Sequence, residues 1–465
     1  MSKMYLAVMC MVFVLACSLR IGLALVNNGE ANDNHFRVSY IILTENRIPQ
    51  RNECEECYHP KLFHVTVAKL WRLLWKQEKV IRDLVTNAQL LNALTGIGTI
   101  VLLWIFIHCL PIGTNAKIFS FSLIALNTEL IGINAQITND TFAIFFTTIA
   151  MYCLFRYVSQ GKVFFLVIMT LSATLAALSK GNALVFFAAT VLILLLRILV
   201  QGKSRWQMKG GYIVPLLIFV TIFLGVAGTM GGYFQKQSGQ GGLEINVTKD
   251  PLPPLAGTDN YHFRRLGVTS ILNSYFTFRF IDLLKHPRIT NGFPAVPGHR
   301  TSLWTQLYGR THFIYFADNP TGLWQADSES ILNCGRVIFV LALFPTVLLC
   351  WGLLKRAYFW GRALVSWKWN FITQEAFWIF DVFMFSYILF IIVFTLQYRD
   401  FCSMKSIYIY PALLAAGYFL AIELNNFYEK FNNRALHIFA NIVLTTLLGL
   451  YVAVIGNMIY RGALG

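Results

Sequence analysis

Reactive side chains gather in one polar stretch near the N-terminus, residues 26–71. It reads VNNGEANDNHFRVSYIILTENRIPQRNECEECYHPKLFHVTVAKLW and contains acids, histidines, a Cys-x-x-Cys pair and a His-Pro-Lys step. Glu30 and Asp33 directly follow the first apolar segment, and a carboxylate there could act as a general base. Asp33, with Asn34 and His35 beside it, is the stronger candidate. The alternative is that Asp33 caps the short helix that follows, because Asp is a favoured N-cap residue.

Three further residues could bind an anion or shape its pocket. Lys61 ends the His59-Pro60-Lys61 step and opens a helix, where a phosphate could meet both its ammonium and the helix N-terminus. Lys180 lies between two apolar runs, and an ionisable group with so little polar cover indicates a function. Asp140 begins another apolar run. Structural alternatives stay open: Lys61 as an interface anchor, Lys180 snorkelling to the bilayer surface, and Asp140 as a helix cap.

The Cys pair has three interpretations. Cys54, Cys57, His59 and His64 could together hold a metal ion, since zinc sites use close Cys pairs. A second Cys pair or a further His pair, as in a zinc finger, is missing. The spacing therefore favours a disulfide that staples the loop, or plain thiols, over a metal site.

Composition indicates a membrane protein. The chain has 465 residues, of which 56% are hydrophobic and 13% charged, and its mean hydropathy is +0.57. Soluble domains carry about 25% charged residues. About ten or more apolar runs approach the ~20 residues that span hydrocarbon. We therefore expect an all-α, polytopic transmembrane bundle of about 11–13 helices, since helices satisfy their own backbone in lipid.

Charge sets the expected orientation. The net charge is +16, and basic residues collect in the connectors 156–162, 197–209 and 355–368, which the positive-inside rule assigns to the cytoplasm. This assignment puts Asp140 and Lys180 on the extracytoplasmic side, together with the opening loop.

The number of apolar runs conflicts with that orientation. Residues 61–82 are expected to run as a helix towards the cytoplasm, and counting every run as a full span then puts Asp140 inside. We therefore expect one run, residues 119–133, to be short or re-entrant.

Polar segments divide the chain into three parts. Residues 1–230 form an N-terminal transmembrane module that includes the first extracytoplasmic loop, 27–60, and residues 231–335 form a long extracytoplasmic loop. Residues 336–465 supply the C-terminal membrane helices. The order of elements shows no internal repeat and no inverted pair of broken helices, which argues against a transporter.

Five segments, in their order and sidedness, resemble one class of enzymes over nearly the whole chain. They are NDNHFRVSYI, CYHPKLFHVTVAKLW, ITNDTFAIFF, LSKGNALVF and FCSMKSIYIYPALLA. The pattern resembles the GT-C class of polytopic glycosyltransferases, in particular dolichyl-phosphate-mannose protein mannosyltransferases and lipid A aminoarabinose transferases. In that class an Asp of the first extracytoplasmic loop is catalytic. Asp33 matches it, whereas Asn34 replaces the Glu of the usual Asp-Glu pair, and the step 60–63 reads Pro-Lys-Leu-Phe where the family often has Pro-Pro-Leu-Tyr.

The resemblance implies an inverting glycosyltransferase. It would move a sugar from a polyprenyl or dolichyl monophosphate to a protein, lipid or glycan acceptor on the extracytoplasmic face. Membrane lipids would be partners, and nucleic acid would not. The membrane would be the endoplasmic reticulum in a eukaryote and the inner or plasma membrane in a prokaryote. The alternative is a non-enzymatic transporter or assembly subunit, which should carry ionisable residues at mid-membrane on several helices; here, Glu129 apart, they cluster at one face.

Site residues follow from the match. Asp33 is the expected general base. The donor phosphate and its pocket are assigned to Lys61, Asp140, Lys180 and His59. Candidates for acceptor or loop contacts are Glu30, His35, His262, Trp304 and Tyr308; the aromatic ones could stack on a sugar or simply dock the loop on the bilayer interface. The sequence assigns no cofactor, and a divalent cation held by Asp33 and Asp140 stays open.

Overall fold

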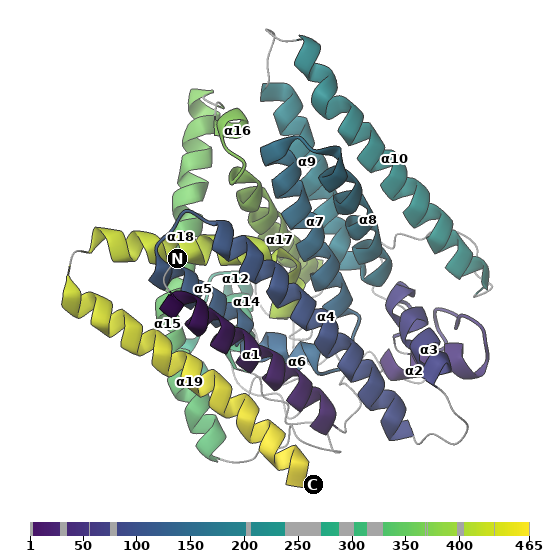
Figure 1. Ribbon diagram of the computed structural model, residues 1–465, viewed down its shortest axis with the longest axis horizontal. Helices are drawn as coiled ribbons and strands as arrows, with labels where there is room; N and C mark the ends of the chain where they lie inside the picture. Colours follow the sequence, from purple (N-terminus) through teal and green to yellow (C-terminus); the bar gives the residue numbers. More distant parts are fainter. Residues whose placement is uncertain are drawn as a thin grey trace.

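The computed structural model describes most of the chain, namely residues 3–27, 35–54, 56–74, 81–200, 206–237, 271–287, 302–313, 329–367, 369, 371–397, 404–431 and 433–464. Every regular element in these ranges is helical (Figure 1). In the first half the helices are α1 (Lys3–Val26), α2 (His35–Thr44), α3 (Leu62–Leu74), α4 (Ile81–Cys109), α5 (Thr114–Ala125), α6 (Thr128–Asn134), α7 (Asp140–Gln160), α8 (Val163–Ser179), η1 (Gly181–Ala183), α9 (Leu184–Val200) and α10 (Trp206–Gln237).

The second half continues the bundle. Its elements are α12 (Ile271–Tyr275), α13 (Phe280–Lys285), α14 (Leu303–His312), α15 (Glu329–Ser366), α16 (Phe371–Gln374), α17 (Trp378–Gln397), η3 (Ser406–Tyr408), η4 (Tyr410–Ala412), α18 (Leu413–Lys430) and α19 (Arg434–Leu464). Within the described residues, eight helices are long and apolar enough to cross a membrane, or nine if α5 and α6 count as one bent span. The predicted all-α polytopic bundle is confirmed.

Contacts between α1 and α4 define two ends of the bundle. Near the start of α1, the Tyr5 hydroxyl lies 3.4 Å from His108 Nδ1, near the end of α4. Just after α1, Asn27 Nδ2 donates to the carbonyl of Ala135, 2.9 Å away. Asn92 of α4 donates to the same segment after α6. The two helices are therefore antiparallel, and we call their ends the Tyr5 end and the Asn27 end.

The bent pair α5–α6 connects these two ends. Thr114 follows the last residue of α4 closely in the chain, so α5 starts at the Tyr5 end. α6 finishes at the Asn27 end, where Arg20 Nε donates to Asn134 Oδ1 at 2.8 Å. The two helices meet at a bend of 46°. These contacts indicate a broken span that crosses the bundle, so the expectation that residues 119–133 are re-entrant is wrong.

The element that does not cross is α3. Its 13 residues are too few for a span, and with α2 it lies at the side of the bundle, to the right in Figure 1. Residues 61–82 were misassigned because an apolar start followed by basic residues also describes a helix that rests beside a membrane. With α3 removed from the count, Asp140 lies at the same end as the opening loop, which is what the charge pattern predicts.

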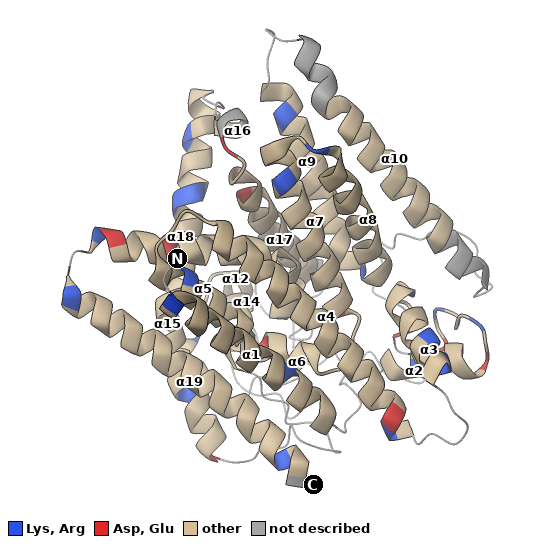
Figure 2. Ribbon diagram, viewed as in Figure 1, with Lys and Arg blue, Asp and Glu red and all other residues tan. Residues whose placement is uncertain are grey.

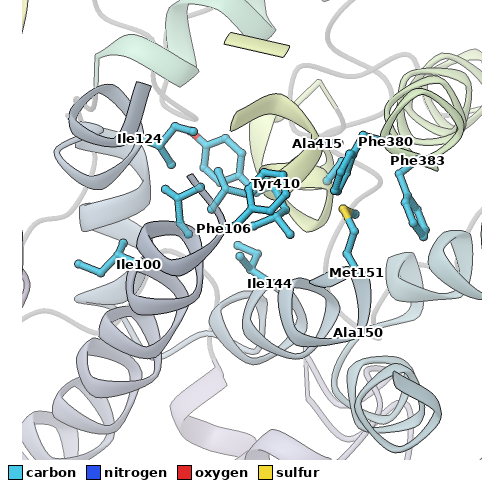
Figure 3. Close-up of a cluster of buried hydrophobic side chains, with 14 of the residues drawn as sticks. Ile100, Phe106, Ile124, Ile144, Ala150, Met151, Phe380, Phe383, Tyr410 and Ala415 are labelled. Carbon is cyan, nitrogen blue, oxygen red and sulfur yellow. The ribbon is translucent and has the colours of Figure 1, made fainter. Parts of the chain in front are cut away.

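One continuous apolar core joins the two halves of the chain. Figure 3 shows part of it, with Ile100 of α4, Met151 of α7 and Phe383 of α17 among the labelled side chains. α1 also packs along α19, where Gly22 faces Ile459. The three-part division at residues 230 and 335 stays a prediction about sequence organisation, since helices of the first and third parts share this core.

A close approach at Gly96 generates a prediction about stability. A Cβ at this position of α4 would lie 2.2 Å from Asn134 Oδ1, the acceptor of the Arg20 bond. Gly96→Ala should displace Asn134 and lower the free energy of unfolding by about 1–3 kcal/mol, the usual cost of overpacking. Thermal unfolding in detergent measures it. Gly449→Ala on α19, where a Cβ meets nothing within 4 Å, is the control; equal melting temperatures for the two variants would contradict the packing argument.

Candidate active site

A buried ion pair marks the Asn27 end. Lys180 Nζ lies 2.6 Å from Asp140 Oδ2, and both side chains are buried, with 10% and 4% of their surface exposed. Asp140 is the first residue of α7, and Lys180 follows the last residue of α8. The two helices form an antiparallel hairpin, so the pair closes its open end. The sequence predicted that these residues share a side, and the structure brings them into contact.

The alternatives for both residues can now be judged. Asp140 does not cap α7: its carboxylate accepts from Lys180 and from Thr138 Oγ1, at 2.9 Å. Lys180 does not snorkel to a surface, because its ammonium is buried against Asp140 and lies 5.7 Å from the centre of the Tyr408 ring, a cation–π contact. Two charges that lie 40 residues apart in the chain are thus held in contact as a preformed polar centre.

Side-chain amides hold the backbone around this centre. Asn92 Nδ2 donates to the carbonyls of Gln136 and Thr138, at 2.7 and 2.9 Å. Asn139 Nδ2 donates to the carbonyl of Ser179 at 3.0 Å, which ties the start of α7 to the end of α8. A non-helical segment inside an apolar bundle needs such partners, since water does not supply them.

Glu129 connects further charged side chains to the pair. Glu129, on α6, interacts electrostatically with Arg310 of α14, with Lys405 just before η3, and with Asp140. We call Glu129, Asp140, Lys180, Arg310 and Lys405 the polar cluster. It holds three cations and two carboxylates, so it can accept an anionic group such as a phosphate.

Bonds between distant segments build the polar cluster. Asn127, the N-cap of α6, accepts from the backbone of Leu130 at 3.0 Å and from the hydroxyl of Tyr410 at 3.1 Å, and it donates to the carbonyl of Thr311 at 2.6 Å. The chain thereby fixes α14 and η4 on the start of α6. Arg310 and Lys405 were missed in the sequence because cations in polar loops are common. Lys405 lies within FCSMKSIYIYPALLA, so that segment was the available signal.

The first loop packs beside the polar cluster. Helix α2 begins at His35, in the segment where the sequence indicates a short helix after Asp33. Cys54 and Cys57 form a disulfide, which excludes their thiolates as metal ligands and confirms the staple. Phe63 of α3 packs edge-on against Phe142 of α7, with ring centres 5.2 Å apart. The loop therefore touches α7 two residues after Asp140.

The predicted phosphate ligands of this loop have partners within it. Lys61 Nζ donates to the carbonyl of Cys57, and burial lowers the pKa of Lys61 to about 8 against the opposing effect of Glu56. His59 Nε2 lies 2.8 Å from Glu56 Oε2. No described contact joins Lys61 or His59 to the Asp140–Lys180 pair, so their predicted roles at the donor stay predictions. Glu30 and Asp33 lie outside the described residues.

Of the three candidates from the long loop, Trp304 and Tyr308 are among the described residues. His262 lies outside the described residues. Tyr308 is buried, and its hydroxyl donates to the carbonyl of Phe339 on α15, while Trp304 Nε1 donates to the carbonyl of Tyr275 at 2.7 Å. Tyr308 thus docks α14 onto α15, whereas Trp304 is 36% exposed and its predicted contact with a ligand stays a prediction.

A solved structure has a similar arrangement of helices. The apo oligosaccharyltransferase of Archaeoglobus fulgidus superposes with a TM-score of 0.50 at 13% sequence identity, over 98% of this chain and 56% of that one. Two others match less well: the S. cerevisiae protein O-mannosyltransferase Pmt1–Pmt2 complex bound to the sugar donor (TM-score 0.37, 16% identity, 49% of this chain and 32% of that one) and ArnT from Cupriavidus metallidurans bound to undecaprenyl phosphate (0.36, 16%, 90% and 78%). The chain thus spans about a third to a half of the length of the first two.

The helical arrangement is thus similar to that of a GT-C glycosyltransferase, the archaeal oligosaccharyltransferase. Residues 75–235 match the family model described as dolichyl-phosphate-mannose-protein mannosyltransferase. The matched range contains Asp140 and Lys180, and it begins after the first loop. A comparison with curated protein sequences finds no match.

The buried pair yields a thermodynamic prediction. Asp140→Asn or Lys180→Met alone leaves one charge buried without its partner, which costs about 3–5 kcal/mol. The double variant removes both charges and should lose clearly less stability than the sum of the singles. Thermal unfolding of the four proteins measures the coupling. Glu53→Gln breaks the more exposed pair with Arg47 and should cost under about 1 kcal/mol. Additive losses at positions 140 and 180 would show that the two charges act independently.

Proposed function

We propose that this protein transfers a sugar from a polyprenyl or dolichyl monophosphate to an acceptor hydroxyl, with inversion at the anomeric carbon. The observation that carries the proposal is the Asp140–Lys180 pair, which lies among further charges at the end of a membrane bundle. It is supported by the mannosyltransferase family match across this pair. A lipid-linked donor keeps its tail in the bilayer, so a site at the end of the helices suits its headgroup.

The cations of the polar cluster are proposed to bind the donor phosphate. Lys180, Arg310 and Lys405 belong to three different elements that meet around α6 and α7. When the bond between the anomeric carbon and the phosphate oxygen breaks, its electron pair leaves with the phosphate. Prearranged cations stabilise that growing negative charge without reorganisation. Asp140 keeps Lys180 in place and partly offsets its charge before the donor binds.

Asp33 is proposed to accept the proton of the acceptor hydroxyl as that oxygen attacks the anomeric carbon. Residues on both sides of the segment 28–34 are tied to the start of α7: Asn27 bonds the carbonyl of Ala135, and Phe36 shares a buried cluster with Ile137 and Phe142. The described residues that flank this segment, Asn27 and Phe36, thus both contact the chain at the start of α7. These contacts support Asp33 as the base.

The site is proposed to face the extracytoplasmic or lumenal side. Figure 2 shows Lys and Arg on the upper parts of α9 and α15, at the opposite end of these helices from the first loop. Arg156 and Lys162, which flank the α7–α8 turn, lie at the far end of the hairpin from Asp140. Positive residues favour the cytoplasmic side, so the Asn27 end faces away from it.

Asp33→Asn tests the proposed base. It should reduce transfer from a radiolabelled polyprenyl-phosphate sugar by about 100-fold or more, the usual contribution of a general base. Glu53→Gln, which breaks the more exposed ion pair with Arg47 in the first loop, is the control and should keep most of the activity. Near-normal transfer by a folded Asp33→Asn protein would sink the assignment of the base.

Lys405→Gln tests the phosphate site. Loss of a hydrogen bond to a charged group costs about 1.5–3 kcal/mol, so KM for the donor should rise about 10–100-fold. Lys117→Gln is the control, because Lys117 donates to the carbonyl of His108 at the Tyr5 end and should leave KM unchanged. An unchanged donor KM in Lys405→Gln would remove this residue from the phosphate site.

A further inference from the structure

We propose that His35, Glu56 and His59 form a binding site for a first-row divalent transition-metal ion, zinc or iron(II) by its ligands, in the first loop. One ligand atom from each of the three residues lies within 4.8 Å of the other two. This site uses neither the cysteines, which are joined in a disulfide, nor the carboxylates of the polar cluster. It is independent of the proposed sugar transfer.

The distances suit such an ion. Glu56 Oε2 lies 2.8 Å from His59 Nε2 and 3.9 Å from His35 Nε2. Ligands about 2.0–2.1 Å from a tetrahedral zinc ion are about 3.4 Å apart. Changes of about 0.5 Å in these two distances, and of at most about 1.4 Å in the distance between the two imidazoles, would therefore place all three ligands around one ion. Two imidazoles and one carboxylate are also the ligand set of zinc enzymes and of many iron(II) enzymes.

A second histidine orients the first. His35 Nδ1 lies 3.0 Å from His64 Nε2, and both residues are buried. If His35 binds the ion through Nε2, its Nδ1 carries the proton and donates it to His64. Metal-bound histidines almost always donate their other ring nitrogen to a neighbour in this way.

The surroundings make this a built site rather than a chance group. Glu56 lies between the two disulfide-bonded cysteines, and the amide of His59 donates to its carbonyl at 3.3 Å. His35 and Glu56 are 1% and 7% exposed, and a bound cation would offset the cost of burying an ionised carboxylate there. The Lys61 ammonium interacts electrostatically with Glu56 and donates to the carbonyl of Cys57.

Metal binding would cross-link two elements. His35 is the first residue of α2, and Glu56 and His59 belong to the loop that precedes α3. The ion would thus fix the start of α2, two residues after Asp33 in the chain. Its role is accordingly to position the first loop.

Metal analysis of the full-length protein in detergent tests the proposal. Purified wild type should contain about one zinc or iron ion per chain. Plasma mass spectrometry measures this content and shows which of the two metals is bound. Glu56→Gln and His59→Gln should each lower that content at least tenfold. Glu53→Gln, the same change in the same loop, should leave it unchanged. His64→Leu should weaken the affinity about 10–100-fold, as loss of an orienting partner does.

A cobalt(II)-substituted wild-type protein supplies a readout that needs no variant to fold. Its visible spectrum should indicate tetrahedral or five-coordinate nitrogen and oxygen ligands, without a thiolate charge-transfer band. A thiolate band would assign the metal to reduced cysteines and overturn the proposal. Two other results would also overturn the proposal. One is a wild-type protein that binds no metal and keeps its melting temperature after incubation with zinc, iron(II) and cobalt(II). The other is full metal content in Glu56→Gln.

Discussion

The contact between Asp140 and Lys180 is the interaction on which the site depends. Each charge costs several kcal/mol to remove from water, and only a close partner with further hydrogen bonds compensates that cost. Thr138 and the Tyr408 ring supply those additional contacts. At the other end of the hairpin, Gly161 closes the turn with a φ of 70°, in the left-handed region that glycine adopts without strain. The register of α7 against α8 is thus set at both ends, and the two charges meet because of it.

Polar side chains elsewhere in the bundle bond backbone carbonyls of residues 125–138, the stretch before α7. Arg20 bonds the carbonyl of Ala125 at the bend between α5 and α6, and Asn27 and Asn92 bond carbonyls between Ala135 and Thr138. Two of the three residues lie on or next to α1, far from this stretch in sequence. In a membrane, helices gain little from apolar contact with each other, so polar bonds contribute strongly to their arrangement. The irregular backbone before α7 is consequently well held, which a preorganised catalytic site requires.

Much of the architecture could be predicted because apolar length and basic connectors are local properties of the sequence. They predicted the membrane bundle, the shared side of Asp140 and Lys180, and helix α2. The error at α3 arose because its apolar start resembles that of a membrane span. The sequence did not show that the helix has only 13 residues, too few to cross. Arg310 and Lys405 could not be singled out, since their importance comes from the folding of α14 and η3 onto α6. The disulfide between Cys54 and Cys57 was one of several interpretations that spacing alone allowed.

The proposed phosphate ligands and the proposed base belong to different parts of the structure. The cations proposed for the donor lie at helix ends and short turns that hydrogen bonds fix within the bundle, whereas the proposed base belongs to the chain between Asn27 and His35. A general base must reach the acceptor within about 3 Å. The described residues on either side of that chain are fixed: Asn27 bonds the carbonyl of Ala135, and Phe36 and Phe63 share a buried cluster with Phe142 of α7. The described neighbours of the proposed base and the proposed donor cations are thus attached to the same stretch, the start of α7.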